Sequence, residues 1–238
     1  ATDESELTRL KDLYRRGLAN GVEGLEMVGI EALKELEPHA AGIAAVHSPN
    51  TGIIDFTDVS RALADEIVET GGQVHVDVEV LRISERDSRV VLETDRGEVT
   101  ANNLVNCAGL HADSVARSMG LDIDVRIVPF RGEYFTLRPD SAGLVNGLLY
   151  PVPDPKMPFL GVHFTKRIGG GVEAGPNAVM ALAREGYKKT EVDLRDMLGV
   201  LQFPGFWRMA RKHWITGIKE QYRSFAKRAF LRSLQALV

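Results

Sequence analysis

The chain has 238 residues, 44% of them hydrophobic and 26% charged, and a formal net charge of −4. This composition is typical of a globular protein with one large domain or two smaller ones, and the net negative charge argues against nucleic acid as a partner. The single cysteine, Cys107, excludes an internal disulfide, and no apolar run approaches the length of a membrane span.

Both ends of the chain indicate a piece of a longer protein. The sequence starts at Ala1 without a methionine, and it ends at Val238 inside a periodic apolar pattern that has no helix stop signal. We therefore expect an internal fragment.

The first 54 residues predict two helices. Apolar residues at helical spacing predict a helix from about Ser5 to Leu18, closed by Asn20-Gly21, and a short one from Gly29 to Leu36. Between Ala40 and Asp55 turn-forming residues dominate, so we expect irregular structure there.

From Asp55 onward the pattern alternates between helix and strand. The predicted elements are a helix from Asp55 or Thr57 to Thr70, a strand at Val74–Val80, a hairpin of Arg89–Thr94 with Glu98–Ala101, a strand at Leu104–Cys107 and a helix at His111–Met119. This order is typical of part of a nucleotide-binding sheet, in which ligands dock where strands end.

After Gly120 several short strands predict a mostly antiparallel sheet. They are Val125–Val128, Tyr134–Leu137, Leu148–Tyr150, Phe159–Phe164 and Gly171–Ala174, followed by helices at Val192–Gln202 and from Thr216 onward. We interpret Gly169-Gly170-Gly171 as a hairpin turn, because no helix follows it as a dinucleotide fingerprint requires.

The segment from Tyr150 to His163 is the first candidate for chemistry. Prolines exclude a helix there: Pro151, Pro153, Pro155 and Pro158. The apolar run that follows predicts a strand that presents His163 in a fixed orientation. A lone histidine on a strand is more often an ordinary core residue, so the residues alone leave both roles open.

Arg131 and the turn at Ala108-Gly109 are two further candidates. Arg131 lies between Phe130 and Gly132, and its planar guanidinium suits a carboxylate; a surface pair with Glu133 is an equal alternative. Ala108-Gly109 ends a predicted strand with small residues that allow close backbone approach to a ligand, although the same residues also serve a plain tight turn. The sequence has no zinc-type spacing and no acyl-transfer nucleophile motif, so we expect no metal site.

The segment from Trp207 to Arg232 is strongly basic. Its one acidic residue is Glu220. Its basic residues are Arg208, Arg211, Lys212, Lys219, Arg223, Lys227, Arg228 and Arg232. A basic amphipathic segment is typical of a membrane-surface or anionic-partner patch, and also of a solvated helix face.

Several short stretches together carry a family resemblance: Leu18–Val22, Thr51–Asp55, Asn106–Leu110, Val128–Tyr134, and the run from Tyr150 through Gly161–Thr165 to Gly175–Ala178. In these stretches the chain resembles FAD-dependent oxidoreductases of the D-amino-acid oxidase/glycine oxidase type. Within that group it is most similar to L-2-hydroxyglutarate oxidases or dehydrogenases, from about Leu7 to Tyr187.

The resemblance implies an α+β fold in which an α/β FAD-binding portion is interleaved with an antiparallel-sheet substrate domain. Residues 1–20 and 55–120 would then belong to the FAD-binding domain, residues 21–54 and 121–215 to the substrate domain, and residues 216–238 to a truncated C-terminal helix. The family's first βαβ unit, with its Gly-x-Gly-x-x-Gly motif, is absent from this sequence, as is a C-terminal segment. We therefore expect the fragment alone to bind FAD weakly or not at all and to be inactive.

The resemblance also implies roles for individual residues. His163 would be the catalytic base, with Arg131, Tyr134 and Tyr150 on the substrate side. Val80, Ala108 and Gly109 would contact FAD.

The expected reaction of the full-length protein is oxidation of a small anionic 2-hydroxy acid, L-2-hydroxyglutarate, to 2-oxoglutarate, by hydride transfer to FAD. The alternatives are an amine-oxidising relative of the glycine or sarcosine oxidase type and a non-catalytic module that binds anionic surfaces. We expect a cytoplasmic protein, either free or peripheral to the inner face of the membrane. The electron acceptor, oxygen or a quinone, and the oligomeric state stay open.

Overall fold

The computed structural model describes residues 1–155 and 161–238, and its chain divides into two compact units. Unit 1 comprises Ala1–Asp55, Phe130–Val179 and His213–Val238, and unit 2 comprises Phe56–Pro129 and Met180–Lys212. These borders do not coincide with the predicted domain borders, and the assignment of domains to FAD or to substrate stays a prediction.

The N-terminal part of unit 1 holds the two predicted helices. Its elements are a 3-10 turn η1 (Glu4–Glu6), α1 (Leu7–Ala19), β1 (Glu26–Gly29), α2 (Ile30–Leu36) and β2 (Ala44–His47). Asn20 ends α1 and Gly21 follows with a φ of 73°, as the sequence predicts. The antiparallel pair β1–β2 contradicts the expectation of irregular structure after Ala40, because four residues are too few to show a strand period.

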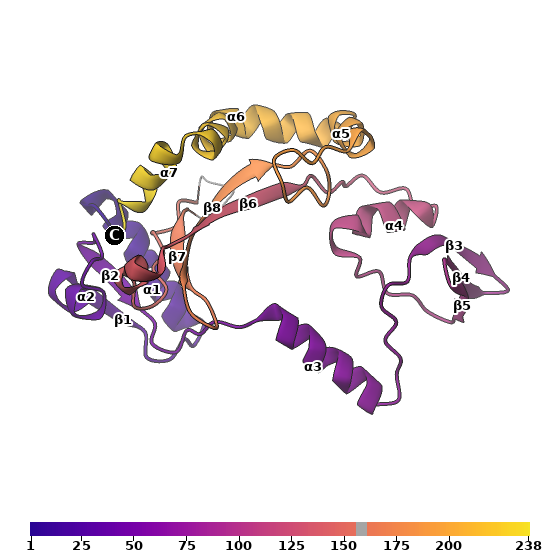
Figure 1. The fold of residues 1–238 in the computed structure, drawn as a ribbon, viewed down its shortest axis with the longest axis horizontal. Coiled ribbons are helices and arrows are strands. Elements are labelled where there is room, and N and C mark those ends of the chain that lie inside the picture. Colours follow the sequence, from indigo (N-terminus) through magenta and orange to yellow (C-terminus); the bar gives the residue numbers. More distant parts are fainter. Residues whose placement is uncertain (156–160) are drawn as a thin grey trace. The chain divides into compact units, whose positions relative to one another are not determined.

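A three-stranded sheet forms the centre of unit 1 (Figure 1). Its order is β6 (Phe130–Thr136), β8 (Val172–Met180) and β7 (His163–Lys166), and β7 and β8 run antiparallel with His163 opposite Gly175. The predicted antiparallel sheet is therefore present. The 3-10 helix η3 (Pro139–Leu144) follows β6, and a turn with Gly169-Gly170-Gly171 joins β7 to β8, as predicted.

Several predicted strand borders in this region are wrong. No strand covers Val125–Val128, and Leu148–Tyr150 contributes a single bridge, Leu149 to Phe164. Residues 156–160, which include the start of the strand predicted at Phe159, lie outside the described residues, and β7 begins at His163. A short apolar run does not show which of its residues will pair with a neighbouring strand. The ends of a strand predicted from such a run are therefore inaccurate.

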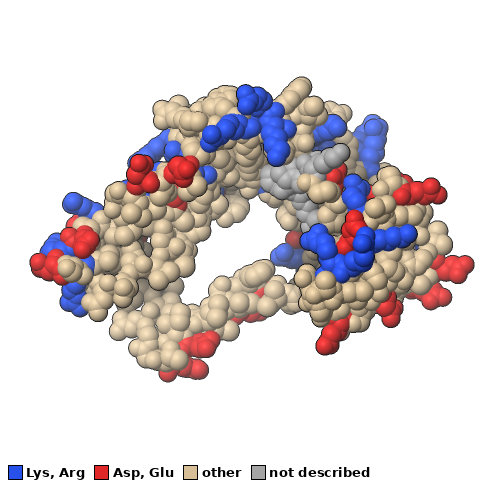
Figure 2. Space-filling view, turned by 180° about the vertical axis from the view of Figure 1, so that it is seen from behind, with Lys and Arg blue, Asp and Glu red and all other residues tan. Residues whose placement is uncertain are grey.

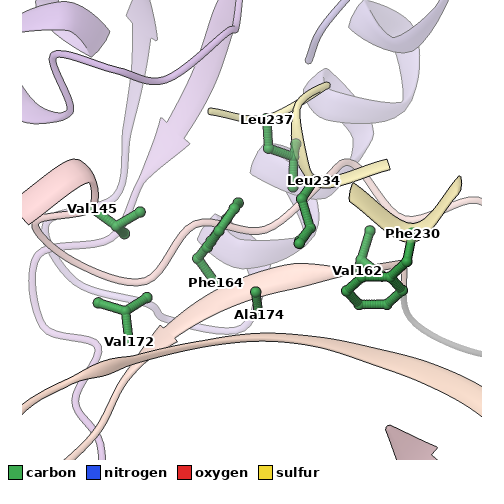
Figure 3. Close-up of a cluster of buried hydrophobic side chains, with 8 residues drawn as sticks. All are labelled: Val145, Val162, Phe164, Val172, Ala174, Phe230, Leu234 and Leu237. Atoms are coloured by element: carbon green, nitrogen blue, oxygen red, sulfur yellow. The ribbon is translucent and has the colours of Figure 1, made fainter. Parts of the chain in front are cut away.

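The core of unit 1 lies between this sheet and the C-terminal helix α7 (Lys227–Leu234). Figure 3 shows its buried side chains: Val145, Val162, Phe164, Val172, Ala174, Phe230, Leu234 and Leu237. The ring of Phe135 lies 4.9 Å from that of Phe230, so α7 covers the sheet face that carries Phe135, Phe164 and Ala174. Burial of each large side chain contributes roughly 1.5–3 kcal/mol.

Unit 2 holds a small three-stranded meander and several helices. Its elements are α3 (Phe56–Glu69), the sheet β3 (Val80–Arg86), β4 (Arg89–Thr94) and β5 (Gly97–Ala101), a 3-10 turn η2 (Gly109–His111), α4 (Ala112–Ser118) and α5 (Leu194–Leu201). The long helix α6 (Pro204–Phe225) starts here and continues into unit 1 from His213. Asp193 caps α5 by accepting a hydrogen bond from the backbone N–H of Asp196 at 2.9 Å. None of the described helices is long and apolar enough to cross a membrane.

Two predicted strands of unit 2 are not formed. Val74–Val80 has no strand conformation before Val80, where β3 begins, and Leu104–Cys107 has none. An alternating pattern makes a strand only where a neighbouring strand pairs with its backbone, and within the described residues neither segment has such a neighbour. The sequence also missed β3 itself as the outer partner of the hairpin.

Candidate functional site

The face of the unit 1 sheet that α7 leaves uncovered carries the candidate histidine. Phe164 packs into the core, so the preceding residue, His163, points to the opposite face, because successive side chains of a strand alternate. Its imidazole stacks on the ring of Tyr150, with centroids 4.3 Å apart and an interplanar angle of 23°. The structure thus joins two residues that the sequence placed on separate strands.

The second contact of His163 fixes its tautomer. Nδ1 lies 3.0 Å from the carbonyl oxygen of Gly161, and a carbonyl only accepts, so Nδ1 carries the proton and donates it. In the neutral imidazole the lone pair is then on Nε2, and among the described residues the Gly161 carbonyl is the one hydrogen-bond partner of the ring. A buried ring held in this way presents a proton acceptor of fixed direction.

Tyr134 lies on the same face, one strand further across the sheet. A Cβ atom on Gly175 would come within 2.7 Å of the Tyr134 ring, so the ring lies directly over the glycine that pairs with His163. Burial raises the pKa of the Tyr134 phenol, with a further contribution from Glu173. The hydroxyl therefore stays neutral near pH 7 and can donate a hydrogen bond. About half of Tyr134 and of Tyr150 is exposed, so both hydroxyl-bearing rings are accessible to a ligand.

Arg131 lies on the other face of β6. It alternates in step with Glu133 and Phe135, and Phe135 packs on Phe230 of α7. Its guanidinium pairs with the Glu133 carboxylate at 3.0 Å, and both side chains are largely buried. The structure therefore does not bring Arg131 to the surface that His163, Tyr150 and Tyr134 share.

In unit 2 the turn at Ala108-Gly109 is exposed and open. Gly109 has a φ of 52°, and nothing lies within 4 Å of where its Cβ would be. The Asn106 side chain holds the turn from both sides: its Oδ1 accepts from Ala108 N at 3.2 Å, and its Nδ2 donates to Ala112 O at 2.8 Å. The third candidate FAD contact, Val80, is the first residue of β3 and its side chain is about half exposed.

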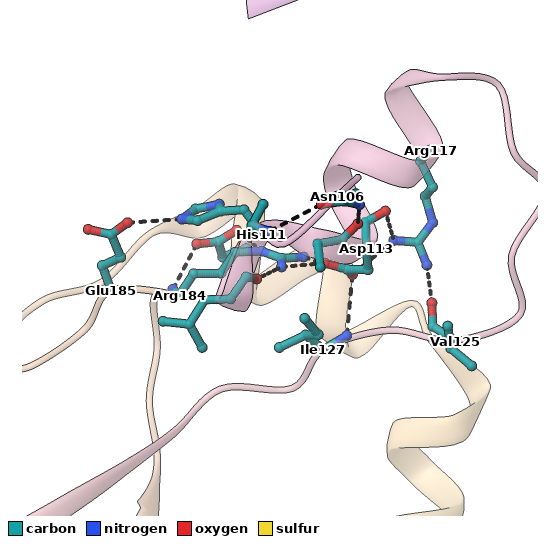
Figure 4. A network of polar contacts seen from close by, with 12 residues as sticks. Asn106, His111, Asp113, Arg117, Val125, Ile127, Arg184 and Glu185 are labelled. Carbon is teal, nitrogen blue, oxygen red and sulfur yellow. Dashed lines mark hydrogen bonds and ion pairs between the residues drawn. The ribbon is translucent and has the colours of Figure 1, made fainter. Parts of the chain in front are cut away.

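A buried ion network supports this turn (Figure 4). Arg184 donates to both oxygens of Asp113, at 2.5 and 3.0 Å, and Arg117 donates to Asp113 Oδ2 at 2.9 Å. Burial alone would raise the pKa of the Asp113 carboxyl, but the hydrogen bonds from Arg184 and Arg117 outweigh it and hold that pKa far below its usual range. The Asp113 side chain is therefore a carboxylate at neutral pH and in mild acid.

The network also connects loops. Arg184 donates to the carbonyl of Leu110, directly after the Ala108-Gly109 turn, and Arg117 donates to the carbonyl of Val125. Asp196, in the first turn of α5, accepts from the backbone N–H of Arg184 at 2.9 Å. Sequence reasoning missed this network, and its one local signal was the helical spacing of Asp113 and Arg117, since Arg184 is 71 residues from Asp113.

Comparison with known proteins gives one family. Residues 1–219 match the family described as FAD dependent oxidoreductase. Among curated proteins, the chain is 44% identical to L-2-hydroxyglutarate dehydrogenase of Indibacter alkaliphilus over 100% of this chain and 60% of that protein. It is 40% identical to that of Escherichia coli strain K12, over 99% of this chain and 56% of that protein. The mitochondrial L-2-hydroxyglutarate dehydrogenase of Mus musculus is 38% identical, over 100% of this chain and 54% of that protein.

Solved structures agree at the level of the fold. Glycine oxidase from Bacillus cereus matches with a TM-score of 0.61 at 18% identity, over 87% of this chain and 54% of that chain. L-Proline dehydrogenase from P. horikoshii matches with a TM-score of 0.61 at 19% identity, over 87% of this chain and 55% of that chain. The chain thus spans little more than half the length of the proteins that it resembles.

Proposed function

The chain belongs to the FAD dependent oxidoreductase family, and from this premise we propose that the full-length protein oxidises L-2-hydroxyglutarate to 2-oxoglutarate. The observation that carries the proposal is the similarity along the whole chain, at 38–44% identity, to curated proteins named L-2-hydroxyglutarate dehydrogenase. The sheet face with His163, Tyr150 and Tyr134 supports it, because it offers a proton acceptor beside two phenol hydroxyl groups.

The residues of unit 2 fit part of an FAD site. The open space at Gly109 and the small side chain of Ala108 allow a nucleotide to approach the backbone closely. Ala108, Gly109 and the backbone at Val80 would hold it, and the Asp113–Arg184 network would keep the turn in place. A glycine-rich pyrophosphate cradle at a helix N-terminus is not part of this sequence.

The reaction removes a hydride and a proton from the substrate. When bound, FAD supplies the acceptor for the two electrons and the hydrogen that leave the α-carbon. His163 takes the hydroxyl proton at Nε2, while Nδ1 keeps its own proton on the Gly161 carbonyl. Stacking on Tyr150 holds the ring plane, so the lone pair keeps one direction through the step.

Substrate orientation falls to the tyrosines. The phenol of Tyr134, kept neutral by its raised pKa, can donate to a substrate carboxylate, and Tyr150 offers a second hydroxyl beside the imidazole. The sequence makes Arg131 a further candidate for carboxylate binding. Because its guanidinium already pairs with the Glu133 carboxylate, we favour the two tyrosines for this role.

The second enzyme candidate is an amine-oxidising relative, since glycine oxidase and L-proline dehydrogenase share the fold. A direct test mixes the full-length, FAD-loaded protein anaerobically with L-2-hydroxyglutarate, D-2-hydroxyglutarate, glycine or sarcosine and follows the loss of flavin absorbance. We expect rapid bleaching by L-2-hydroxyglutarate alone. Bleaching by glycine or sarcosine, with none by L-2-hydroxyglutarate, would contradict the proposal.

The electron acceptor and the location of the protein stay predictions. Oxygen and a quinone are both compatible with the proposed reaction. A cytoplasmic protein at the inner face of the membrane is compatible with the basic residues of α6.

A further inference from the structure

The proposed substrate carries two carboxylates. One lies beside the carbon that reacts, and the other lies at the far end of the five-carbon chain. The proposal assigns the first of them to Tyr134 and Tyr150, beside His163. Four C–C bonds of ~1.5 Å place the two carboxyl carbons about 5 Å apart in the extended chain. A partner for the distal carboxylate must therefore lie on the same sheet face, a short step from His163.

Arg167, directly after β7, extends over this face. Its Nη1 donates a hydrogen bond to the carboxylate of Glu173 at 3.2 Å, and Glu173 pairs with Thr165 across the sheet. Cross-strand partners share a face, and Thr165 shares that face with His163 because strand side chains alternate. The Thr165–Glu173 pair lies two residues, about 7 Å, along the strand from the His163–Gly175 pair. This separation is comparable with the length of the substrate.

The titration of Tyr134 indicates that the same groups surround its hydroxyl. Burial is the main cause that raises the pKa of the Tyr134 phenol; Glu173 and Tyr150 raise that pKa further, and the Arg167 guanidinium lowers it. A charge acts on a half-exposed phenol only within about a Debye length, ~8 Å. The two tyrosines and the Arg167–Glu173 pair therefore form one polar cluster next to the imidazole.

The strands themselves place no other cation on this face. Arg131 on β6 and Lys166 on β7 alternate with Tyr134 and Thr165, so within the described strands both point to the opposite side. Many other lysine and arginine side chains gather at the top of the view in Figure 2, where α6 lies. Among the described residues of β6, β7, β8 and the turn after β7, the cation of this face is Arg167.

Arg167 is anchored at its backbone and accessible at its tip. Its N–H donates to the carbonyl of Gly171 at 3.1 Å, and its carbonyl accepts from the N–H of Gly170 at 3.1 Å. Its side chain is 61% exposed, whereas that of Arg131 is largely buried in its pair with Glu133. Within the described residues Glu173 contacts Nη1 alone, which leaves the edge formed by Nε and Nη2 for a ligand.

We infer that the Arg167 guanidinium binds the distal carboxylate of L-2-hydroxyglutarate and so selects dicarboxylic 2-hydroxy acids over those with an apolar end. The inference rests on the proposed function. The planar edge of Nε and Nη2 donates two parallel hydrogen bonds to the two carboxylate oxygens. Glu173, which holds Nη1, is a positioning residue.

The test compares two substrates of the full-length, FAD-loaded protein. They are L-2-hydroxyglutarate and L-2-hydroxypentanoate, which has the same five carbons and a methyl group in place of the distal carboxylate. In Arg167→Gln we expect KM for L-2-hydroxyglutarate to rise about 10-fold with little change in kcat, because a charge-assisted contact is lost. The value of kcat/KM for L-2-hydroxypentanoate should stay unchanged, and Arg167→Lys should restore part of the affinity for the diacid.

Two control variants separate carboxylate binding from charge and from the ion pair. Lys166→Gln removes the neighbouring exposed cation, which points to the opposite side, and should leave both KM values unchanged. Glu173→Gln breaks the ion pair but leaves the guanidinium on the face. It should therefore raise KM for L-2-hydroxyglutarate less than Arg167→Gln does, and an equal rise in the two variants would overturn the inference.

Glutarate measures binding without turnover, because it has both carboxylates and no hydroxyl group to oxidise. In calorimetric titration it should bind wild type about 10-fold more tightly than Arg167→Gln, while pentanoate should bind both proteins alike. If Arg167→Gln changes the kinetics of both substrates equally, or of neither, the inference is wrong and the proposed function stands. If L-2-hydroxyglutarate does not reduce the flavin of wild type, both are wrong.

Discussion

Different interactions stabilise the interior of each of the two units. Unit 1 has a continuous apolar core beneath the sheet, with Phe164, Ala174 and Phe230 all but fully buried. Unit 2 has few buried apolar residues, and its helix α3 buries none. Its loops are joined instead by the buried carboxylate of Asp113 and the guanidinium of Arg184.

This difference has consequences for the site. The sheet face that carries His163 is held in place by the apolar core packed against the opposite face of the sheet. Such packing is insensitive to salt and pH. The Ala108-Gly109 turn is positioned by ions, so its geometry depends on charge. A substitution or a change of pH should therefore affect one unit more than the other. Each of the following predictions concerns one unit in the full-length protein.

The largest effect should come from the core of unit 1. Phe230→Ala should lower the free energy of unfolding by about 4 kcal/mol, because it removes a fully buried ring and leaves a cavity. Chemical denaturation measures the change. Leu231→Ala, on the exposed side of the same helix, is the matched control and should cost much less. Equal costs for the two variants would mean that α7 does not cover this core.

The corresponding change in unit 2 is Asp113→Asn. It should cost about 3 kcal/mol, since it leaves the buried Arg184 and the partly buried Arg117 with a neutral partner, and it should weaken FAD binding through the turn at Gly109. Asp12→Asn, which breaks an exposed pair with Arg15, is the control and should change neither quantity measurably. If FAD titration shows equal affinity for Asp113→Asn and wild type, the ion network does not support FAD binding and this prediction is wrong.

The pH should act on unit 2 in a definite direction. The folded-state pKa of Asp113 lies below its unfolded value of about 3.9. Its contribution to stability is therefore fully present above that value and is lost as the pH falls below about 4. Urea midpoints between neutral and acidic pH should fall less steeply for Asp113→Asn than for wild type; parallel curves would contradict the assignment.

The smallest effect concerns the seating of Tyr134. In Gly175→Ala the new Cβ would lie 2.7 Å from the Tyr134 ring and 2.8 Å from the Glu133 carbonyl oxygen, so the ring and the adjoining backbone of β6 must shift. The loss of one substrate hydrogen bond, ~1 kcal/mol, should raise KM about five-fold and change kcat less. Gly143→Ala, at a glycine with open space around its Cβ position, should leave KM unchanged.

The helices were predictable because their signals are local. Periodic apolar residues with end signals such as Asn20-Gly21 predicted α1, α2, α3 and α5 within a few residues. The proposed strands at Val74–Val80 and Leu104–Cys107 failed for the opposite reason. Their pattern is local, but a strand needs a partner, and the described residues supply none.

The candidate site was predictable only in part. Tyr150 and His163 were recognisable as one functional stretch, but the stacking of their rings depends on how the Tyr150 loop meets β7. Arg131 and Tyr134 looked equivalent in sequence, while the strand alternation places them on opposite faces of β6. The ion network was out of reach, since it joins Asp113 to a residue far along the chain.

We propose that His163, on the sheet face of unit 1 that α7 leaves uncovered, is the catalytic base. This proposal has a direct test. It is the rate of flavin reduction by L-2-hydroxyglutarate in full-length His163→Ala protein with FAD bound, compared with wild type and with His39→Ala, an exposed histidine of the same unit. We predict a rate lower by about 10²- to 10⁴-fold for His163→Ala, with near-normal substrate affinity, and no change for His39→Ala. Reduction of His163→Ala at the wild-type rate would contradict the account.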